Sequence, residues 1–216
     1  MIDRKKLRIR PETPEDYPAV ESLIRDAFWN LYVPGCDEHY VAHALRGHAD
    51  FIPALDLVAE LDGCIVGSVM YTQAVLEDET GARKEILTFG PLAVLPACQR
   101  QGVGKALLDA SFEIAGAMGY DVIVIFGHPG NYVARGFKSC RKYNVCMPDG
   151  SFPTAMLVKE LTAGALDGRK WLYHESPAYA VDPDGFPAFD AQFPPRPREY
   201  RPSQEEFYIY SHSFIR

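Results

Sequence analysis

The sequence predicts an α/β fold of the α+β type, built on one mixed, mostly antiparallel central sheet. Three observations indicate this fold. Strand-rich segments between residues 56 and 94 are joined by tight turns, as in antiparallel hairpins. A glycine turn and an amphipathic helix follow, and they lead into a fully apolar segment at Val122–Phe126. Strand, helix and strand in this order make a right-handed β-α-β crossover, so these two strands should be parallel.

The N-terminal part predicts one strand and two helices. Residues 7–10 alternate apolar and charged side chains, as a half-buried strand does. Thr13 and Pro14 supply the cap and first turn of a helix that should run to about Phe28. A second helix is expected over residues 37–46, because a glycine follows it directly.

A hairpin and a third strand follow. The turn Asp62-Gly63 joins strands expected over residues 57–61 and 64–71. A second turn leads to a strand over residues 86–94, which carries Pro91 near its end. Proline donates no backbone hydrogen bond, so this strand should be unpaired or bulged at that point.

The C-terminal half completes the domain and adds an extension. After the glycine turn we expect a helix over residues 105–118, a short helix over residues 132–135 and a last strand at Met156–Glu160. From residue 162 onward, prolines and aromatic side chains alternate in what we expect to be an irregular arm. We therefore divide the chain into a domain over residues 1–161 and an extension over residues 162–216 that packs on the domain or on a second subunit, as in a homodimer.

Composition excludes several classes of protein. The 216 residues are 47% hydrophobic and carry a net charge of -7, which argues against general binding of nucleic acid. No apolar run approaches the roughly 20 residues that span a bilayer, and no signal-like segment follows the charged start. The five cysteines are widely spaced without a Cys-x-x-Cys pair, which favours free thiols. We expect a cytoplasmic protein that does not bind membranes.

The glycine turn is the segment that points to chemistry. It reads Gln99-Arg100-Gln101-Gly102-Val103-Gly104 and is followed at once by Lys105 and the amphipathic helix. The first backbone N–H groups of a helix have no internal partner and, together with the helix dipole, bind anions. Because glycines leave room and two cations stand beside them, the turn predicts a diphosphate site.

Two nucleotide-binding motifs do not fit this turn. A Walker loop needs Gly-x-x-x-x-Gly-Lys-[Ser/Thr], but Cys98 stands at its first glycine and Ala106 at its hydroxyl position. The dinucleotide fingerprint Gly-x-Gly-x-x-Gly meets Leu107 at its last glycine, and the turn follows a hairpin instead of opening the fold.

The remaining pattern, [Gln/Arg]-x-x-Gly-x-[Gly/Ala] between a strand and a helix, resembles motif A of the GCN5-related N-acetyltransferase (GNAT) family. The resemblance covers residues 7–161 and is densest over residues 89–104. It implies an acyl-coenzyme-A-dependent N-acetyltransferase with splayed parallel central strands and acetyl-coenzyme A as cofactor. The cofactor-binding residues that it implies in this region are Leu92, Ala93, Val94, Gln99, Arg100, Gln101, Gly102, Val103, Gly104 and Lys105.

A second landmark of the family lies in residues 127–137. By this resemblance Asn131 is a further cofactor contact and Tyr132 is the general acid that protonates the departing thiolate. The alternative for Tyr132 is a half-buried aromatic residue that caps the core. The resemblance also implies direct attack of the amine in a ternary complex, with a backbone N–H stabilising the oxyanion.

The general base and the acceptor are not predicted by these motifs. Thr88 stands where some members of the family carry a glutamate, so Glu85 and His128 remain as weak candidates, beside water. Acidic residues in the segments that should form the acceptor pocket would attract a cationic amine, although most should be ordinary surface charges: Asp37, Glu38, Glu77 and Asp78.

Histidines and a cysteine near the motif, and a class of protein other than an enzyme, offer alternatives. His39 and His43 lie four residues apart on a helix with His48 nearby, but no glutamate follows His39 as in a zinc-protease helix, so no metal site is predicted. Cys98 adjoins the turn and is interpreted as a small buried thiol. The alternative to an enzyme is a non-catalytic acyl-coenzyme-A-binding module that acts through a partner protein.

Overall fold

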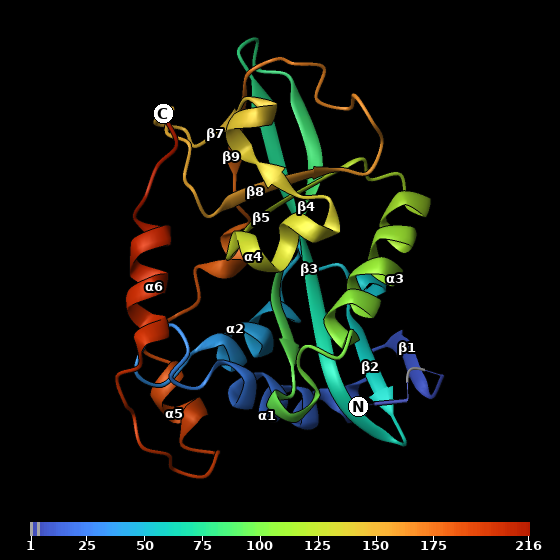
Figure 1. Cartoon of the computed structure of the whole chain (residues 1–216), viewed down its shortest axis with the longest axis vertical. Coiled ribbons are helices and arrows are strands. Elements are labelled where there is room, and N and C mark those ends of the chain that lie inside the picture. The colour runs from blue at the N-terminus through green and yellow to red at the C-terminus, as the bar shows by residue number, and fades with distance from the viewer. Residues whose placement is uncertain (1, 4) are drawn as a thin grey trace.

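The computed structural model describes residues 2–3 and 5–216 as nine strands and six α-helices with short 3₁₀ turns (Figure 1). The strands are β1 (Leu7–Pro11), β2 (Leu57–Leu61), β3 (Cys64–Asp78), β4 (Arg83–Val94), β5 (Val122–Phe126), β6 (Lys138–Ser139), β7 (Val145–Cys146), β8 (Met156–Glu160) and β9 (Trp171–His174). The helices are α1 (Tyr17–Phe28), α2 (Glu38–Leu45), α3 (Val103–Ala117), α4 (Pro129–Tyr132), α5 (Phe186–Asp190) and α6 (Pro202–Ser211). No helix of the described part is both long and apolar enough to cross a bilayer.

All nine strands belong to one mixed sheet. Its main order is β1-β2-β3-β4-β5-β8-β6, and β9 pairs with the far end of β3 and with β7. Neighbouring strands are antiparallel except for β4 with β5 and β7 with β9, which are parallel. The register between β4 and β5 consists of the pair Leu87 and Ile123. Beyond that pair the two strands diverge, so the predicted crossover with splayed parallel strands is confirmed.

The long β3–β4 hairpin extends further than its sequence pattern predicts. Strand β3 continues to Asp78 and β4 begins at Arg83. Ala74 and Leu76 on the added length of β3 are buried, and Ala74 lies opposite the buried Ile86. The bulge predicted at Pro91 is confirmed, since the register with β3 shifts between the pairs Val69–Leu92 and Tyr71–Phe89.

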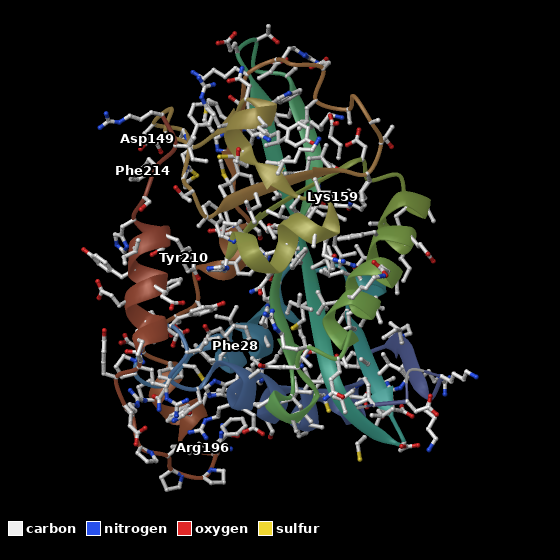
Figure 2. All side chains as sticks on the ribbon, in the orientation of Figure 1. Phe28, Asp149, Lys159, Arg196, Tyr210 and Phe214 are labelled. Carbon is white, nitrogen blue, oxygen red and sulfur yellow. The ribbon has the colours of Figure 1, made fainter. Side chains whose placement is uncertain are left out.

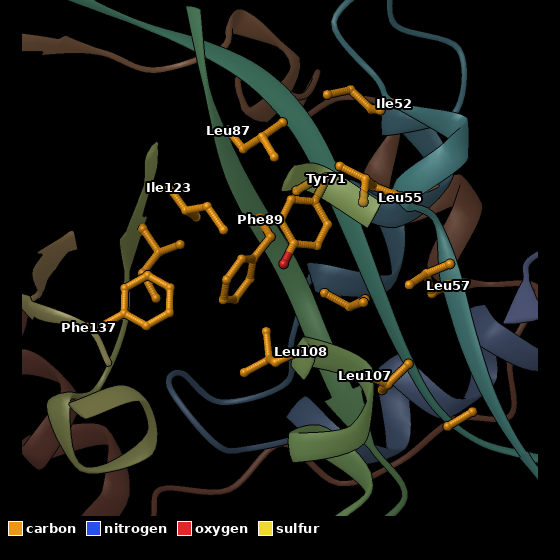
Figure 3. Packing of buried hydrophobic residues seen from close by; sticks show 14 of the residues in the cluster. Ile52, Leu55, Leu57, Tyr71, Leu87, Phe89, Leu107, Leu108, Ile123 and Phe137 are labelled. Atoms are coloured by element: carbon orange, nitrogen blue, oxygen red, sulfur yellow. The ribbon is translucent and has the colours of Figure 1, made fainter. Parts of the chain in front are cut away.

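Helices cover both faces of the sheet. Alternation along each strand sends Leu57, Val69 and Tyr71 to the face that packs on α3, in a cluster that includes Phe89 and Leu107 (Figure 3). The intervening side chains, such as Val58, Met70 and Ala93, pack on α1 and α2 on the other face. Each fully buried apolar side chain of this kind contributes roughly 1.5–3 kcal/mol relative to exposure. This packing fixes β4 between the two helical layers.

The C-terminal extension is more regular than predicted. Strand β9 joins the central sheet, and its Trp171 and Tyr173 are buried in a cluster with residues of β5 and β8. The expectation of an irregular arm is therefore wrong for this segment, because alternation over only four residues is too short to predict a strand. Arg25 of α1 donates to Asp190 of α5 at 2.9 Å. The division into a domain and an extension stays a prediction.

Helix α6 and the segments beside it run along the outside of the body (Figure 1). Before the helix, the carbonyl of Pro197 accepts from the side chains of Trp29 and Asn30 at 3.0 and 3.1 Å. After the helix, the backbone N–H of Thr154 donates to the carbonyl of Ser213 at 2.8 Å. The extension therefore joins the end of α1 to the segment that precedes β8.

Candidate active site

A cavity of about 970 Å³ opens where β4 and β5 diverge. Its walls come from α1, whose Phe28 is labelled in Figure 2, from the segment between α1 and α2, from α2 itself, from the end of β4, from the turn and the start of α3, from the end of β5 and the segment between β5 and β6, and from one residue of the extension. The lining residues outside the predicted cofactor set are Ala27, Phe28, Leu31, Tyr32, Glu38, Val41, Phe89, Gly90, Pro91, Cys98, Leu108, Phe126, Gly127, Tyr132, Ala134, Arg135 and Tyr179.

The glycine turn has the backbone geometry of an anion site. Arg100 has φ +60° and Gly102 has φ +97°, so the chain turns sharply and Gly102 forms the cap of α3. A Cβ on Gly104 would meet nothing closer than Val94 Cγ2 at 3.6 Å. The space at Gly104 is therefore not required by the protein's own packing and is free for a ligand at the helix N-terminus.

The cavity brings together ten of the eleven predicted cofactor-binding residues. They are Leu92, Ala93, Val94, Gln99, Arg100, Gly102, Val103, Gly104, Lys105 and Asn131. Gln101 is the exception, because its side chain accepts from the N–H of Ile2 at 2.7 Å and donates to the carbonyl of Ala97 at 2.9 Å. It supports the fold of the turn from outside the cavity.

Two other side chains of the turn also have partners in the protein. Gln99 donates to the carbonyl of Val94 at 3.1 Å and so closes the end of β4. Lys105 pairs with Asp109, one turn further along α3, and both side chains are about half exposed. An exposed pair of this kind stabilises the helix by about 0.5 kcal/mol or less, so an incoming phosphate can compete for the lysine.

Tyr132 ends α4 and lines the cavity. Its ring packs against Phe89 at 5.7 Å and Phe137 at 5.8 Å between centroids. Burial raises the pKa of the Tyr132 phenol, with a smaller contribution from Tyr32, so the hydroxyl keeps its proton at neutral pH. The residue therefore both packs on the core and lines the cavity.

The sequence-based candidates for a general base do not line the cavity. Glu85 is exposed on β4, opposite Val75 of β3. His128 is exposed and caps α4, where its Nδ1 accepts from the N–H of Gly130 at 3.1 Å. Thr88 is buried in β4, opposite Thr72.

Three further residues of the cavity lie outside the two family motifs, and of these only Glu38 is among the four acids that the sequence offers as attracting a cationic amine. Tyr179 of the extension donates to the carbonyl of Gly90 at 3.1 Å, directly before Pro91. Tyr32 lies under Phe207 of α6, with ring centroids 4.7 Å apart. Glu38 begins α2, and it is the single acid among the described residues that line the cavity. No local pattern marks these residues, because they come from segments far apart in the sequence.

The two histidines of α2 each pair with an acidic residue. His39 bonds to Asp190 at 3.0 Å and His43 to Glu21 at 3.0 Å. The described residues contain no group of three side chains placed to hold a metal ion. Cys98 is half-buried and lines the cavity, and all five cysteines are free thiols.

A helix N-terminus open to an anion, an unpaired strand edge and a protonated phenol in one cavity are the features that an acyl-coenzyme-A-dependent acyltransferase needs. Comparisons agree. Residues 20–139 match the model of the acetyltransferase (GNAT) family. The uncharacterized N-acetyltransferase YhbS of Escherichia coli is 30% identical over 171 residues, which is 77% of this chain and 96% of that protein.

Further relatives match a shorter part of the chain or have a lower sequence identity. The uncharacterized N-acetyltransferase YjhQ of Escherichia coli is 34% identical over 88 residues, covering 41% of this chain and 48% of that protein. The crystal structure of YhbS in complex with CoA has a TM-score of 0.70 and 24% identity, over 82% of this chain and 93% of the other. A GNAT acetyltransferase of Brucella melitensis in complex with acetyl-CoA has a TM-score of 0.62 and 24% identity, over 80% and 97%.

The chain belongs to the GNAT acetyltransferase family. This confirms the fold class and the enzyme class predicted from the sequence, an acyl-coenzyme-A-dependent N-acyltransferase with acetyl-coenzyme A as its cofactor.

Proposed function

We propose that this protein transfers the acetyl group of acetyl-coenzyme A directly to an amine while both are bound in the cavity between β4 and β5. The observation that carries the proposal is the continuity of that cavity. One set of walls holds the helix start at Gly102, the free edge of β4 at Leu92 and the phenol of Tyr132. These are the three contacts that a diphosphate, an extended pantetheine arm and a departing sulfur need.

The start of α3 is proposed to hold the pyrophosphate. The backbone N–H groups of Val103, Gly104 and Lys105 have no partner inside the helix and lie at its positive end. Arg100 adds a cation from the turn. The cofactor would supply a thioester carbonyl to this site, since the acyl group it carries is already activated for attack by an amine.

The edge of β4 is proposed to bind the pantetheine arm as an added strand would. From Thr88 to Val94 this edge has no pairing with β5, because the two strands meet at Leu87 and Ile123 and then separate. Unpaired backbone groups of a strand edge bind an extended ligand through main-chain hydrogen bonds. A backbone N–H of this stretch would also stabilise the oxyanion, a contribution of roughly 3–4 kcal/mol in enzymes where it has been removed.

Tyr132 is proposed as the general acid. Its phenol keeps its proton because burial raises its pKa, whereas a thiol has an ordinary pKa of about 8.5. The proton is therefore available to the sulfur as negative charge develops there. Replacing Tyr132 should lower turnover without weakening cofactor binding.

Two measurements test the proposed function. Acetyl-coenzyme A should raise the melting temperature, because a ligand that binds the folded state stabilises it. A thiol-release assay across amines, amino acids, aminoglycosides and peptide N-termini should then identify an acceptor. Stabilisation without any thiol release would favour the non-catalytic binding module, and absence of both would overturn the proposal. Location in the cytoplasm and assembly as a homodimer stay predictions.

A further inference from the structure

The acceptor end of the cavity is aromatic and carries one acid. Its walls include the rings of Phe28, Tyr32, Phe126, Tyr132 and Tyr179. The charged side chains that line the whole cavity are Glu38, Arg100, Lys105 and Arg135. The three cations come from the turn, from α3 and from the segment after α4, which leaves Glu38 alone on the wall formed by α1 and α2.

Tyr32, Glu38 and Tyr132 all line the same cavity. The pKa of Tyr32 is raised first by burial and then by the negative charge of Glu38. The pKa of Tyr132 is raised first by burial and then by Tyr32. The Tyr32 phenol therefore interacts electrostatically with both the carboxylate and the proposed acid.

We propose that Glu38 binds the ammonium group of the acceptor and takes its proton, an inference that rests on the proposed function. An ammonium that enters this end finds one carboxylate to pair with and aromatic faces that favour a cation. An acceptor with a carboxylate next to its amine would bring a second negative charge beside Glu38. The preferred substrates are therefore primary amines without an α-carboxylate.

The proton balance of the transfer is complete with these two side chains. The acceptor enters as RNH3+ and gives one proton to a Glu38 oxygen, and the freed nitrogen lone pair forms the bond to the carbonyl carbon. The carbon–sulfur bond breaks with its electron pair on sulfur, which takes the Tyr132 proton. The second nitrogen proton returns to the Tyr132 oxygen. Glu38 then releases its proton to solvent, so amide, thiol and one proton are the products.

The surroundings of Glu38 suit a base that works near neutral pH. Burial, and secondarily the charge of Asp37, raise its pKa to about 7, although the N–H of Asp37 donates to Oε2 at 3.2 Å. The phenols that line the same cavity, from the segment before α2, from α4 and from the extension, have raised pKa values: Tyr32, Tyr132 and Tyr179. The pKa of Tyr210 of α6, which interacts with Tyr32, is raised as well. Burial also raises the pKa of the Cys36 thiol, on which Arg25 acts in the opposite direction. The other charged side chains that line the cavity are Arg100, Lys105 and Arg135.

The experiment compares Glu38→Gln and Glu38→Asp with Glu113→Gln, a matched change at an exposed acid of α3. In Glu38→Gln we expect kcat/KM for the amine to fall at least about 100-fold and the limb of its pH profile near pH 7 to disappear. Glu38→Asp should keep part of the activity and the limb, and Glu113→Gln should behave like the wild type. The thermal shift with acetyl-coenzyme A should persist in all three variants.

A second readout needs no turnover. Calorimetric titration of 2-phenylethylamine into protein saturated with coenzyme A at pH 8 should show binding that is at least tenfold weaker in Glu38→Gln. Phenylalanine, which differs by its carboxylate, should bind the wild type more weakly than 2-phenylethylamine. If the wild type acetylates amines and Glu38→Gln has the same kcat/KM and the same pH profile, the role of Glu38 is overturned and the proposed function is not. A wild-type protein that acetylates no amine would overturn the proposed function, and this role with it.

Discussion

The ring of Tyr132 lies against the backbone of Gly127, so that a Cβ on Gly127 would come within 2.5 Å of Tyr132 Cε2. Real Cβ atoms do not approach another atom so closely, and an alanine at 127 must therefore displace the ring. Gly127 directly follows β5. Because it has no side chain, the Tyr132 ring can lie against its backbone and line the cavity.

Gly127→Ala should therefore lower kcat. A shift of about 1 Å at a catalytic group can cost about 100-fold in rate, so we expect at least a tenfold loss, together with destabilisation of about 1–3 kcal/mol. Gly116→Ala on the exposed side of α3 is the control, because a Cβ there meets nothing within 4 Å. Steady-state kinetics and urea unfolding check both variants. A folded Gly127→Ala protein with wild-type kcat would show that the position of the ring is unimportant.

Tyr132→Phe removes the hydroxyl and keeps the ring. We expect kcat to fall by about 100-fold or more, because general acid catalysis typically contributes that much. The dissociation constant of acetyl-coenzyme A should stay within twofold of the wild type. Tyr120→Phe, at a half-buried tyrosine outside the cavity lining, should change neither quantity. Equal kcat in Tyr132→Phe and wild type would leave the residue as a core aromatic.

Phe207→Ala tests the contribution of the extension to the acceptor wall. The Phe207 ring stacks on Tyr32, and its loss should loosen that wall and cost about 1–2 kcal/mol of stability. We expect the KM of the acceptor to rise several-fold while the affinity for acetyl-coenzyme A stays unchanged. Tyr208→Ala, at an exposed residue of the same helix, is the control. A matched loss of cofactor affinity would contradict a role confined to the acceptor end.

Asp56→Asn should make stability less dependent on pH. Burial first, and then the neighbouring Glu12, raise the pKa of Asp56, whose Oδ1 has no hydrogen-bond partner among the described residues. As pH rises above about 4 the unfolded chain ionises this group while the folded chain keeps it protonated, so stability falls by up to about 1.4 kcal/mol per pH unit. Asparagine removes this loss.

Urea unfolding at pH 5 and pH 8 measures this effect. The stability of Asp56→Asn relative to the wild type should increase from pH 5 to pH 8, and Asp62→Asn at the exposed hairpin turn should show no such trend. A relative stability that falls with pH would mean that Asp56 is ionised in the folded protein.

Local features predicted most of the fold, and ten of the eleven residues that they indicate for the cofactor line one cavity. Strand β5 and strand β8 have the predicted bounds, because an apolar run with clear ends needs no tertiary information. The glycine turn is equally predictable from the sequence, since its backbone must bend and leave space whatever surrounds it. Sequence spacing alone is enough for such segments.

The acceptor half depends on contacts between distant segments. Glu38 lies in the first turn of a helix, where an acid is ordinarily explained by the helix dipole, so the sequence does not distinguish it from Asp37. Tyr179 reaches Gly90 from the extension, 89 residues further along the chain. Strand β9 is not predicted because the alternation of its four residues is too short, and its pairing with β3 and β7 is a contact between distant segments.

Calorimetric titration of acetyl-coenzyme A tests the central claim most directly. The wild type should bind one equivalent, and Gly104→Val, which fills the space at the start of α3, should bind at least tenfold more weakly, a difference of about 1.4 kcal/mol. Gly116→Val makes the same change near the other end of the same helix, where nothing lies within 4 Å, and should bind like the wild type. No binding to the wild type, or equal binding to Gly104→Val, would contradict the account.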